Sequence, residues 1–98
     1  MQIKKCLHTA ILVTDLEKAK EFYGQILGLP QVERQLKFPG VWYQVGDYQI
    51  HLMVNLVGKK ELINEHKWGR NAHIAFSVDD LAAAKKCLQA YGSPIQLR

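Results

Sequence analysis

One stretch of sequence occurs twice and decides the fold: HTAILVTDLEKAK at residues 8–20 and HIAFSVDDLAAAK at residues 73–85. The copies lie 65 residues apart, and seven of their 13 aligned pairs are identical. Both pass from a strand-like apolar pattern through an acidic turn to a helical pattern. Because identity and pattern coincide, the sequence predicts a duplicated module. The identical pairs are His8/His73, Ala10/Ala75, Val13/Val78, Asp15/Asp80, Leu16/Leu81, Ala19/Ala84 and Lys20/Lys85.

Each copy is expected to form a strand followed by a helix. In the first copy, residues 3–13 carry the alternating and β-branched apolar residues of a strand, and residues 14–17 supply a helix cap with an acidic first turn. In the second copy Asp79 and Asp80 take the capping place. Both helices are expected to stop at a glycine followed by a proline, Gly28 with Pro30 and Gly92 with Pro94. The apolar helix stripes are Leu16, Ala19, Phe22, Tyr23, Ile26 and Leu27, and Leu81, Ala84, Leu88 and Tyr91.

Three further strands are predicted after the first helix, at residues 31–38, 41–45 and 48–55. They complete a βαβββ module over about residues 3–55. A polar connection follows at residues 56–70, with one helical turn expected around residues 61–66. The second module begins at residue 71 and has room only for a strand, a helix and the start of a strand at residues 94–98. We therefore predict a single α+β domain over residues 1–98 whose second module is truncated.

Composition and charge exclude several classes of function. The 98-residue chain has 48% hydrophobic and 22% charged residues, as a packed globular domain does. Its net charge of +4 is spread along the chain, and no finger spacing or phosphate loop occurs, so no nucleic-acid partner is expected. No apolar run could cross a membrane. Cys6 and Cys87 form no C-x-x-C pair and are expected to be reduced, as in a cytoplasmic protein.

Three histidines are predicted to share one chemical environment. Strand alternation places His8, His51 and His73 opposite the strongly apolar face of their strands. If helices cover the apolar faces, the three imidazoles point into the concave side of the sheet and can converge on one metal ion. Imidazole suits Zn, Ni, Fe, Mn or Co. The alternative is that each histidine is polar filler on a half-exposed face, and His66, in the connection, is expected to be a surface residue.

These motifs resemble the vicinal oxygen chelate superfamily, which includes glyoxalase I, bleomycin-resistance proteins and extradiol dioxygenases. The similarity covers nearly the whole chain and is most specific at residues 7–10, 15–23, 27–29, 49–52 and 73–80. It implies paired βαβββ modules forming a curved mixed sheet. It also implies metal ligands on the first and last strand of a module, which carry over to His8, His51 and His73.

The chain departs from the glyoxalase pattern in two places. A glutamate is usual where this chain has His51, so one carboxylate and one candidate proton acceptor are lost. The fourth ligand of the family is a glutamate whose expected position lies beyond Arg98. The catalytic residue is therefore unknown. Either the gene encodes a further C-terminal piece, or the protein is a natural fragment that completes itself with a partner chain. We expect the first, because the break falls inside a strand.

The resemblance implies a divalent-metal-dependent enzyme of lyase, isomerase or dioxygenase type, which chelates a small-molecule substrate through adjacent oxygens. The alternative is a metal-independent protein that sequesters a small ligand, as bleomycin-resistance relatives do. Trp42, Tyr43 and Tyr48 could then line a cleft or could simply pack in the sheet. A homodimer is also expected, with Tyr23, Phe38 and Trp68 as candidate contacts or core residues.

Overall fold

The computed structural model describes residues 1–34, 37–55 and 62–96, and the chain divides into two compact units, Met1–Lys59 and Lys60–Arg98. The boundary between the units falls inside the connection predicted at residues 56–70. No helix in the described ranges is long and apolar enough to cross a membrane. That the two units form a single domain stays a prediction.

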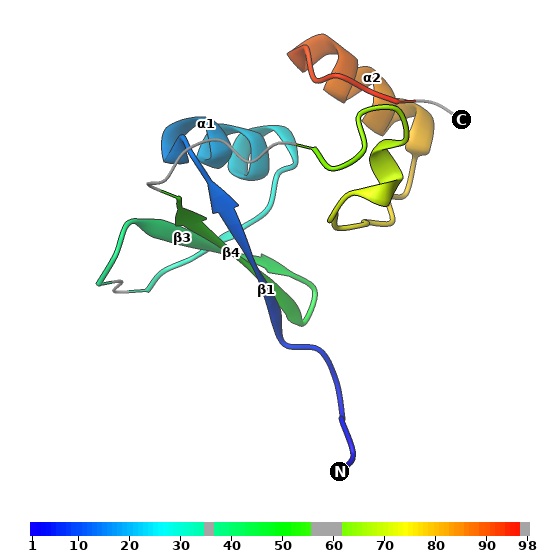
Figure 1. Cartoon of the computed structure of the whole chain (residues 1–98). Coiled ribbons are helices and arrows are strands. Elements are labelled where there is room, and N and C mark those ends of the chain that lie inside the picture. Colours follow the sequence, from blue (N-terminus) through cyan, green and yellow to red (C-terminus); the bar gives the residue numbers. More distant parts are fainter. Residues whose placement is uncertain (35–36, 56–61, 97–98) are drawn as a thin grey trace. The chain divides into compact units, whose positions relative to one another are not determined.

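The first unit is a four-stranded mixed sheet with one helical segment against it (Figure 1). Its sheet order is β1-β4-β3-β2, with β1 parallel to β4 and the other neighbours antiparallel. This βαβββ order and the α+β class confirm the prediction for the first module. In chain order the elements are β1 (His8–Val13), α1 (Leu16–Lys20), the π-helical segment η1 (Glu21–Ile26), β2 (Gln31–Val32), β3 (Gly40–Val45) and β4 (Tyr48–Val54).

The duplicated stretch builds the same helix start in both units. The side chain of Asp15 caps α1 by accepting a hydrogen bond from the backbone nitrogen of Lys18 at 3.1 Å. Asp80, its equivalent, caps α2 (Leu81–Tyr91) by accepting from the nitrogen of Ala83 at 3.0 Å. α2 ends at Gly92, whose φ of 92° only glycine adopts without strain. The predicted caps and stops are therefore correct.

The core of the first unit lies between the sheet and the helical segment. Ile50 and Leu52 on β4 are fully buried, and Tyr43 on β3 is 2% exposed. The Tyr43 hydroxyl donates to the Lys20 carbonyl, and its ring stacks with Tyr23. The apolar side chains of α1 and η1 are half-buried against this layer. Four apolar side chains form the buried core among the described residues: Val41, Tyr43, Ile50 and Leu52.

The hairpin between β3 and β4 has Gly46 as the first residue of its loop. Val45 pairs with Tyr48, so only Gly46 and Asp47 lie in the loop. Gly46 has a φ of 59°, whereas no residue other than glycine has a positive φ in the described ranges. A positive φ at the first loop residue alone is the pattern of a type II′ turn, which matches the twist of the two strands.

Gly46→Ala is expected to lower the free energy of unfolding by about 1–2 kcal/mol, because a side chain at positive φ clashes with the backbone. Urea denaturation measures the loss. Asp47→Ala is the control, since Asp47 lies in the same loop with a negative φ and should change stability by less than about 0.5 kcal/mol. Equal losses in the two variants would contradict the turn assignment.

The second unit differs from the predicted second module. Residues 71–78 form no strand, and neither do residues 94–96; residues 97–98 lie outside the described ranges. A strand needs a neighbour for its backbone N–H and C=O groups. The described elements here are the short 3-10 helix η2 (Trp68–Arg70) and α2, neither of which offers a strand edge. Phe76 and Val78 are 41% and 51% exposed as a result.

Three smaller predictions also need correction. The first strand begins at His8, and residues 3–7 precede it as an exposed tail (Figure 1). The strand predicted at residues 31–38 covers only Gln31–Val32, and residues 35–36 lie outside the described ranges. The helical turn predicted at residues 61–66 is absent from residues 62–66, and η2 forms a few residues later. Residue 61 lies outside the described ranges.

Candidate functional site

Two of the predicted histidines lie on the sheet face opposite α1 and η1, which we call the uncovered face because no other described element of the first unit lies on it. Ile50 and Leu52 face α1 and η1, so His51, between them in β4, projects from the opposite face. β1 alternates in the same way, with His8 exposed and its neighbour Thr9 half-buried. The parity predicted for His8 and His51 is confirmed.

The ring of His51 is stacked between two other rings. It faces His8 with 4.1 Å between ring centroids and 16° between planes, and Trp42 stacks on it from the neighbouring strand. The register explains this, because Trp42 is the cross-strand partner of His51, and β1 lies on the other side of β4. His51 is only 6% exposed although it projects from the face opposite α1 and η1. Neighbouring rings have replaced water around it.

A guanidinium extends the stack. The carbon atom Cζ of Arg34 lies 3.8 Å from the centroid of the Trp42 ring, which is cation–π geometry. Arg34, Trp42, His51 and His8 therefore form a continuous column across the uncovered face. We call these four residues the ring column.

Charge and burial in the ring column act on His51 in the same direction. Burial lowers the pKa of His51 below its ordinary value of 6.5, and the nearby His8 and Arg34 lower it further by charge repulsion. Both causes disfavour the imidazolium form. His51 is consequently held neutral near pH 7, the form in which imidazole can bind a metal ion.

Acidification is expected to destabilise the fold through His51. Because the pKa of His51 is lower in the folded chain than in the unfolded chain, the unfolded chain takes up the proton first as the pH falls. The stabilisation from neutral His51 is thus complete above about pH 6.5 and is lost as the pH falls below it. Urea denaturation between pH 8 and pH 5 should show a shallower pH dependence in His51→Phe than in the wild type. His66→Phe, at an exposed position, should keep the wild-type dependence.

His73 belongs to the second unit, where a backbone carbonyl sets its tautomer. Its Nδ1 lies 2.7 Å from the carbonyl oxygen of Asn71, which can only accept, so Nδ1–H donates and Nε2 keeps the lone pair. Asn71 is itself buried and bonded to the backbone of Asn64 and Trp68. A ligating histidine commonly has its second nitrogen held by a carbonyl in this way.

The structure contains the donors that the metal-binding prediction named, but they do not form an assembled site in the described residues. The described residues include no group of three or more His, Cys, Asp or Glu side chains placed to hold a metal ion. His8 and His51 stack nearly parallel, so their lone pairs do not converge on one point. His8 is exposed, and its ring can leave the stack without disturbing the core. The chemistry of the donors fits a divalent transition metal, and binding requires His8 to turn.

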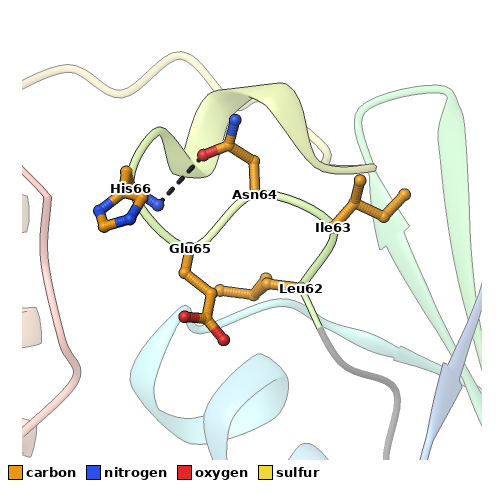
Figure 2. Close-up of a pocket in the computed structure, with 5 residues that line it drawn as sticks. All are labelled: Leu62, Ile63, Asn64, Glu65 and His66. Atoms are coloured by element: carbon orange, nitrogen blue, oxygen red, sulfur yellow. Dashed lines mark hydrogen bonds between the residues drawn. The ribbon is translucent and has the colours of Figure 1, made fainter.

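An open cavity lies elsewhere in the chain. It has a volume of about 360 Å³ and is lined by Leu62, Ile63, Asn64, Glu65 and His66. Figure 2 shows the loop curled around Asn64, whose Oδ1 accepts a hydrogen bond from the backbone nitrogen of His66. His66 is exposed, as predicted. None of the three candidate ligands lines this cavity, so it does not mark the candidate site.

The sequence reasoning missed three residues near His51. Arg34 follows the short strand β2, and no sequence pattern in that segment predicts its position near Trp42. Gln49 shares the face of His51 by strand alternation, and Gln44 is the cross-strand partner of Gln49. Strand parity was available as a signal for the two glutamines, but amide side chains carry no specific chemical motif.

The βαβββ sheet, the repeated strand–helix stretch and the histidines on the uncovered face together define a protein of the glyoxalase-like class. The chain belongs to the Glyoxalase/Bleomycin resistance protein/Dioxygenase superfamily, whose family model matches residues 5–97.

Individual relatives agree with this assignment. A "Probable lactoylglutathione lyase" of Vibrio cholerae is 28% identical over 96 residues, which cover 94% of this chain and 70% of the relative. The lactoylglutathione lyase of Agrobacterium tumefaciens has a similar fold, with a TM-score of 0.65, 21% identity and coverage of 99% of this chain and 77% of that chain. A genomically encoded fosfomycin resistance protein of Listeria monocytogenes gives a TM-score of 0.74 at 19% identity, covering 99% and 75%.

Proposed function

We propose that this protein is a divalent-metal-dependent enzyme of the superfamily, of lyase, isomerase or dioxygenase type, and that His8, His51 and His73 bind the metal. The observation that carries the proposal is the contact of the His8 and His51 rings on the uncovered sheet face. The lowered pKa of His51 supports it, because a neutral imidazole is ready to ligate.

The residues of the chain have separable roles in this proposal. A divalent cation would supply Lewis-acid polarisation of two adjacent oxygens of a small-molecule substrate. His51 and His73 each present one lone pair, and His8 turns from the stack to join them. Trp42 and Arg34 lie beside His51 in the ring column, where the positive charge of Arg34 favours a substrate with anionic character. The proton-transfer step is not assigned to a residue of this chain.

A lyase reaction is the first to test, because the relative from Vibrio cholerae has the name of a lactoylglutathione lyase.

Titration of the purified metal-free chain with Zn²⁺, Ni²⁺ or Mn²⁺, followed by calorimetry, tests metal binding before any substrate is added. At a free metal concentration of 100 times Kd, the free energy of unfolding should rise by about 2.7 kcal/mol. No binding heat and an unchanged Tm with all three ions would reject the proposal.

The second candidate is metal-independent binding of a small ligand. Of the three aromatic residues predicted to line a cleft, only Trp42 lies on the uncovered face. Tyr43 is buried against η1, and the Tyr48 hydroxyl is hydrogen-bonded to Thr9. The half-buried indole of Trp42, with Arg34 over it, favours a planar or anionic ligand. Ligand binding that persists in EDTA and in His8→Ala would favour this candidate over the enzyme.

We further propose a homodimer in the cytoplasm. Phe38 is 48% exposed and available for a contact, whereas Tyr23 packs against Tyr43. Trp68 is half-buried, with its indole N–H donating to the Glu65 carbonyl. Cys6 and Cys87 are free and exposed, which supports a reducing compartment. Light scattering of the purified chain tests the dimer, and a monomer mass at micromolar concentration would reject it.

A further inference from the structure

His51 stands at the end of a line of side-chain amides. Its Nε2 lies 3.3 Å from Oε1 of Gln49. Nε2 of Gln49 donates to Oε1 of Gln44 at 3.0 Å, and Nε2 of Gln44 donates to the carbonyl oxygen of Gly46 at 2.8 Å. Register brings the two glutamines together, because Gln44 and Gln49 are cross-strand partners on β3 and β4. We call Gln44 and Gln49 the amide relay.

The carbonyl of Gly46 fixes the direction of the relay. A carbonyl oxygen only accepts hydrogen bonds, so Gln44 must present its NH₂ group to Gly46 and its oxygen to Gln49. Gln49 must then present its NH₂ group to Gln44 and its oxygen to His51. An amide turned the other way would place two oxygens or two NH₂ groups face to face. Each choice follows from the one before it.

The last acceptor in the line determines the proton on His51. Oε1 of Gln49 can only accept, so Nε2 of His51 must carry the hydrogen. A neutral imidazole has one N–H, and the lone pair is therefore on Nδ1. We propose that Gln44 and Gln49 are positioning residues that fix His51 in the Nε2–H tautomer and so make Nδ1 its ligand atom. The ligand role of Nδ1 rests on the proposed function, whereas the tautomer does not.

The amide relay has a specific consequence for metal affinity. The partner that holds the second nitrogen of a ligating histidine selects its tautomer and orients the ring, and its loss commonly costs about 10–100-fold in metal affinity. Oε1 of Gln49 accepts from Nε2 of His51, just as the Asn71 carbonyl accepts from Nδ1 of His73. The two histidines are held through different nitrogens, so opposite ring atoms are left for ligation. The relay selects the His51 tautomer without a rearrangement of any other residue.

Gln44→Lys tests the relay without altering His51. Lysine donates and cannot accept, so Gln49 should turn its oxygen toward position 44 and its NH₂ group toward His51. Nε2 of His51 must then accept, and the proton moves to Nδ1. Long-range ¹⁵N–¹H NMR of the metal-free chain at pH 8 distinguishes the two tautomers directly. Gln31→Lys is the matched control, because it adds the same charge opposite Tyr43, on the sheet face that the side chain of Gln44 does not share.

The expected result is an Nε2–H tautomer in the wild type and in Gln31→Lys, and an Nδ1–H tautomer in Gln44→Lys. The inversion should weaken metal binding by about 10–100-fold. If Gln44→Lys does not fold, a second variant, Gln49→Leu, takes its place. It removes the acceptor and should give a mixture of the two His51 tautomers. An Nδ1–H tautomer in the wild type, an unchanged tautomer in Gln44→Lys, or inversion in Gln31→Lys would overturn the assignment.

The two proposals fail separately. The tautomer is observed in the metal-free chain, so a wild-type chain that binds no metal would reject the proposed function and leave the relay assignment standing. A chain that binds metal normally while Gln44→Lys keeps the Nε2–H tautomer would reject the relay and leave the metal site standing.

Discussion

Leu52→Ala is expected to lower the free energy of unfolding by about 2–5 kcal/mol, which is the usual cost of truncating a buried leucine. Leu52 is fully buried and stands in the centre of the sheet, with Ile11 and Val41 as its register partners on either side. A folded protein domain has about 5–15 kcal/mol of stability in total. The variant should therefore lose a large share of its stability, with its midpoint shifted to lower urea concentration when unfolding is followed by circular dichroism.

Leu12→Ala is the matched control for that effect. Leu12 is a leucine of the same sheet, on the neighbouring strand β1, but it projects from the uncovered face and is 54% exposed. Truncation there removes little buried surface, so the loss should stay within about 1 kcal/mol. A similar loss at both positions would contradict the exposure of Leu12 on the uncovered face.

His51→Ala is expected to abolish measurable metal binding. Loss of a hydrogen-bond partner of a ligand costs about 10–100-fold in affinity, and loss of the ligand itself should cost more. His51 is the candidate ligand with the least exposed ring, held between His8 and Trp42, so a replacement residue cannot easily take its place. Calorimetric titration with Zn²⁺ or Ni²⁺ measures the loss.

The emission of Trp42 gives a second readout of the same substitution. Trp42 stacks on His51, so its fluorescence should respond to metal in the wild type and not in His51→Ala. His66→Ala controls for adventitious binding at an exposed histidine. Wild-type affinity in His51→Ala would contradict the ligand assignment, and an equal loss in His66→Ala would show that binding is not specific to the ring column.

Local sequence signals accounted for the caps of α1 and α2 and for the end of α2. Asp15 and Asp80 were recognisable as caps because a capping carboxylate bonds an amide only three residues ahead. Gly92 was recognisable as a stop because the left-handed conformation is a property of that one residue. Strand parity likewise placed His8 and His51 on one face, since alternation along a strand is set by the backbone alone.

Features that depend on residues far apart in the chain could not be predicted from any short stretch of sequence. The pattern at residues 71–78 is that of a strand, yet no strand forms there, because apolar alternation does not provide a neighbouring edge. Near His51, the sequence indicated a histidine on an open face but not its stacking with Trp42 or the direction of the amide relay. Those depend on the register of β3 against β4.

The sequence by itself determined the superfamily, the βαβββ order of the first module, the caps of α1 and α2 and the face on which His8 and His51 lie. Each of these follows from backbone geometry over a few residues or from the repeat of a whole stretch. Only the tertiary structure decided which predicted strands formed, which rings enclosed His51 and which nitrogen of that ring carries the proton. These depend on groups that are far apart in the chain and meet only when the sheet is paired, so the fold has to form before they are defined.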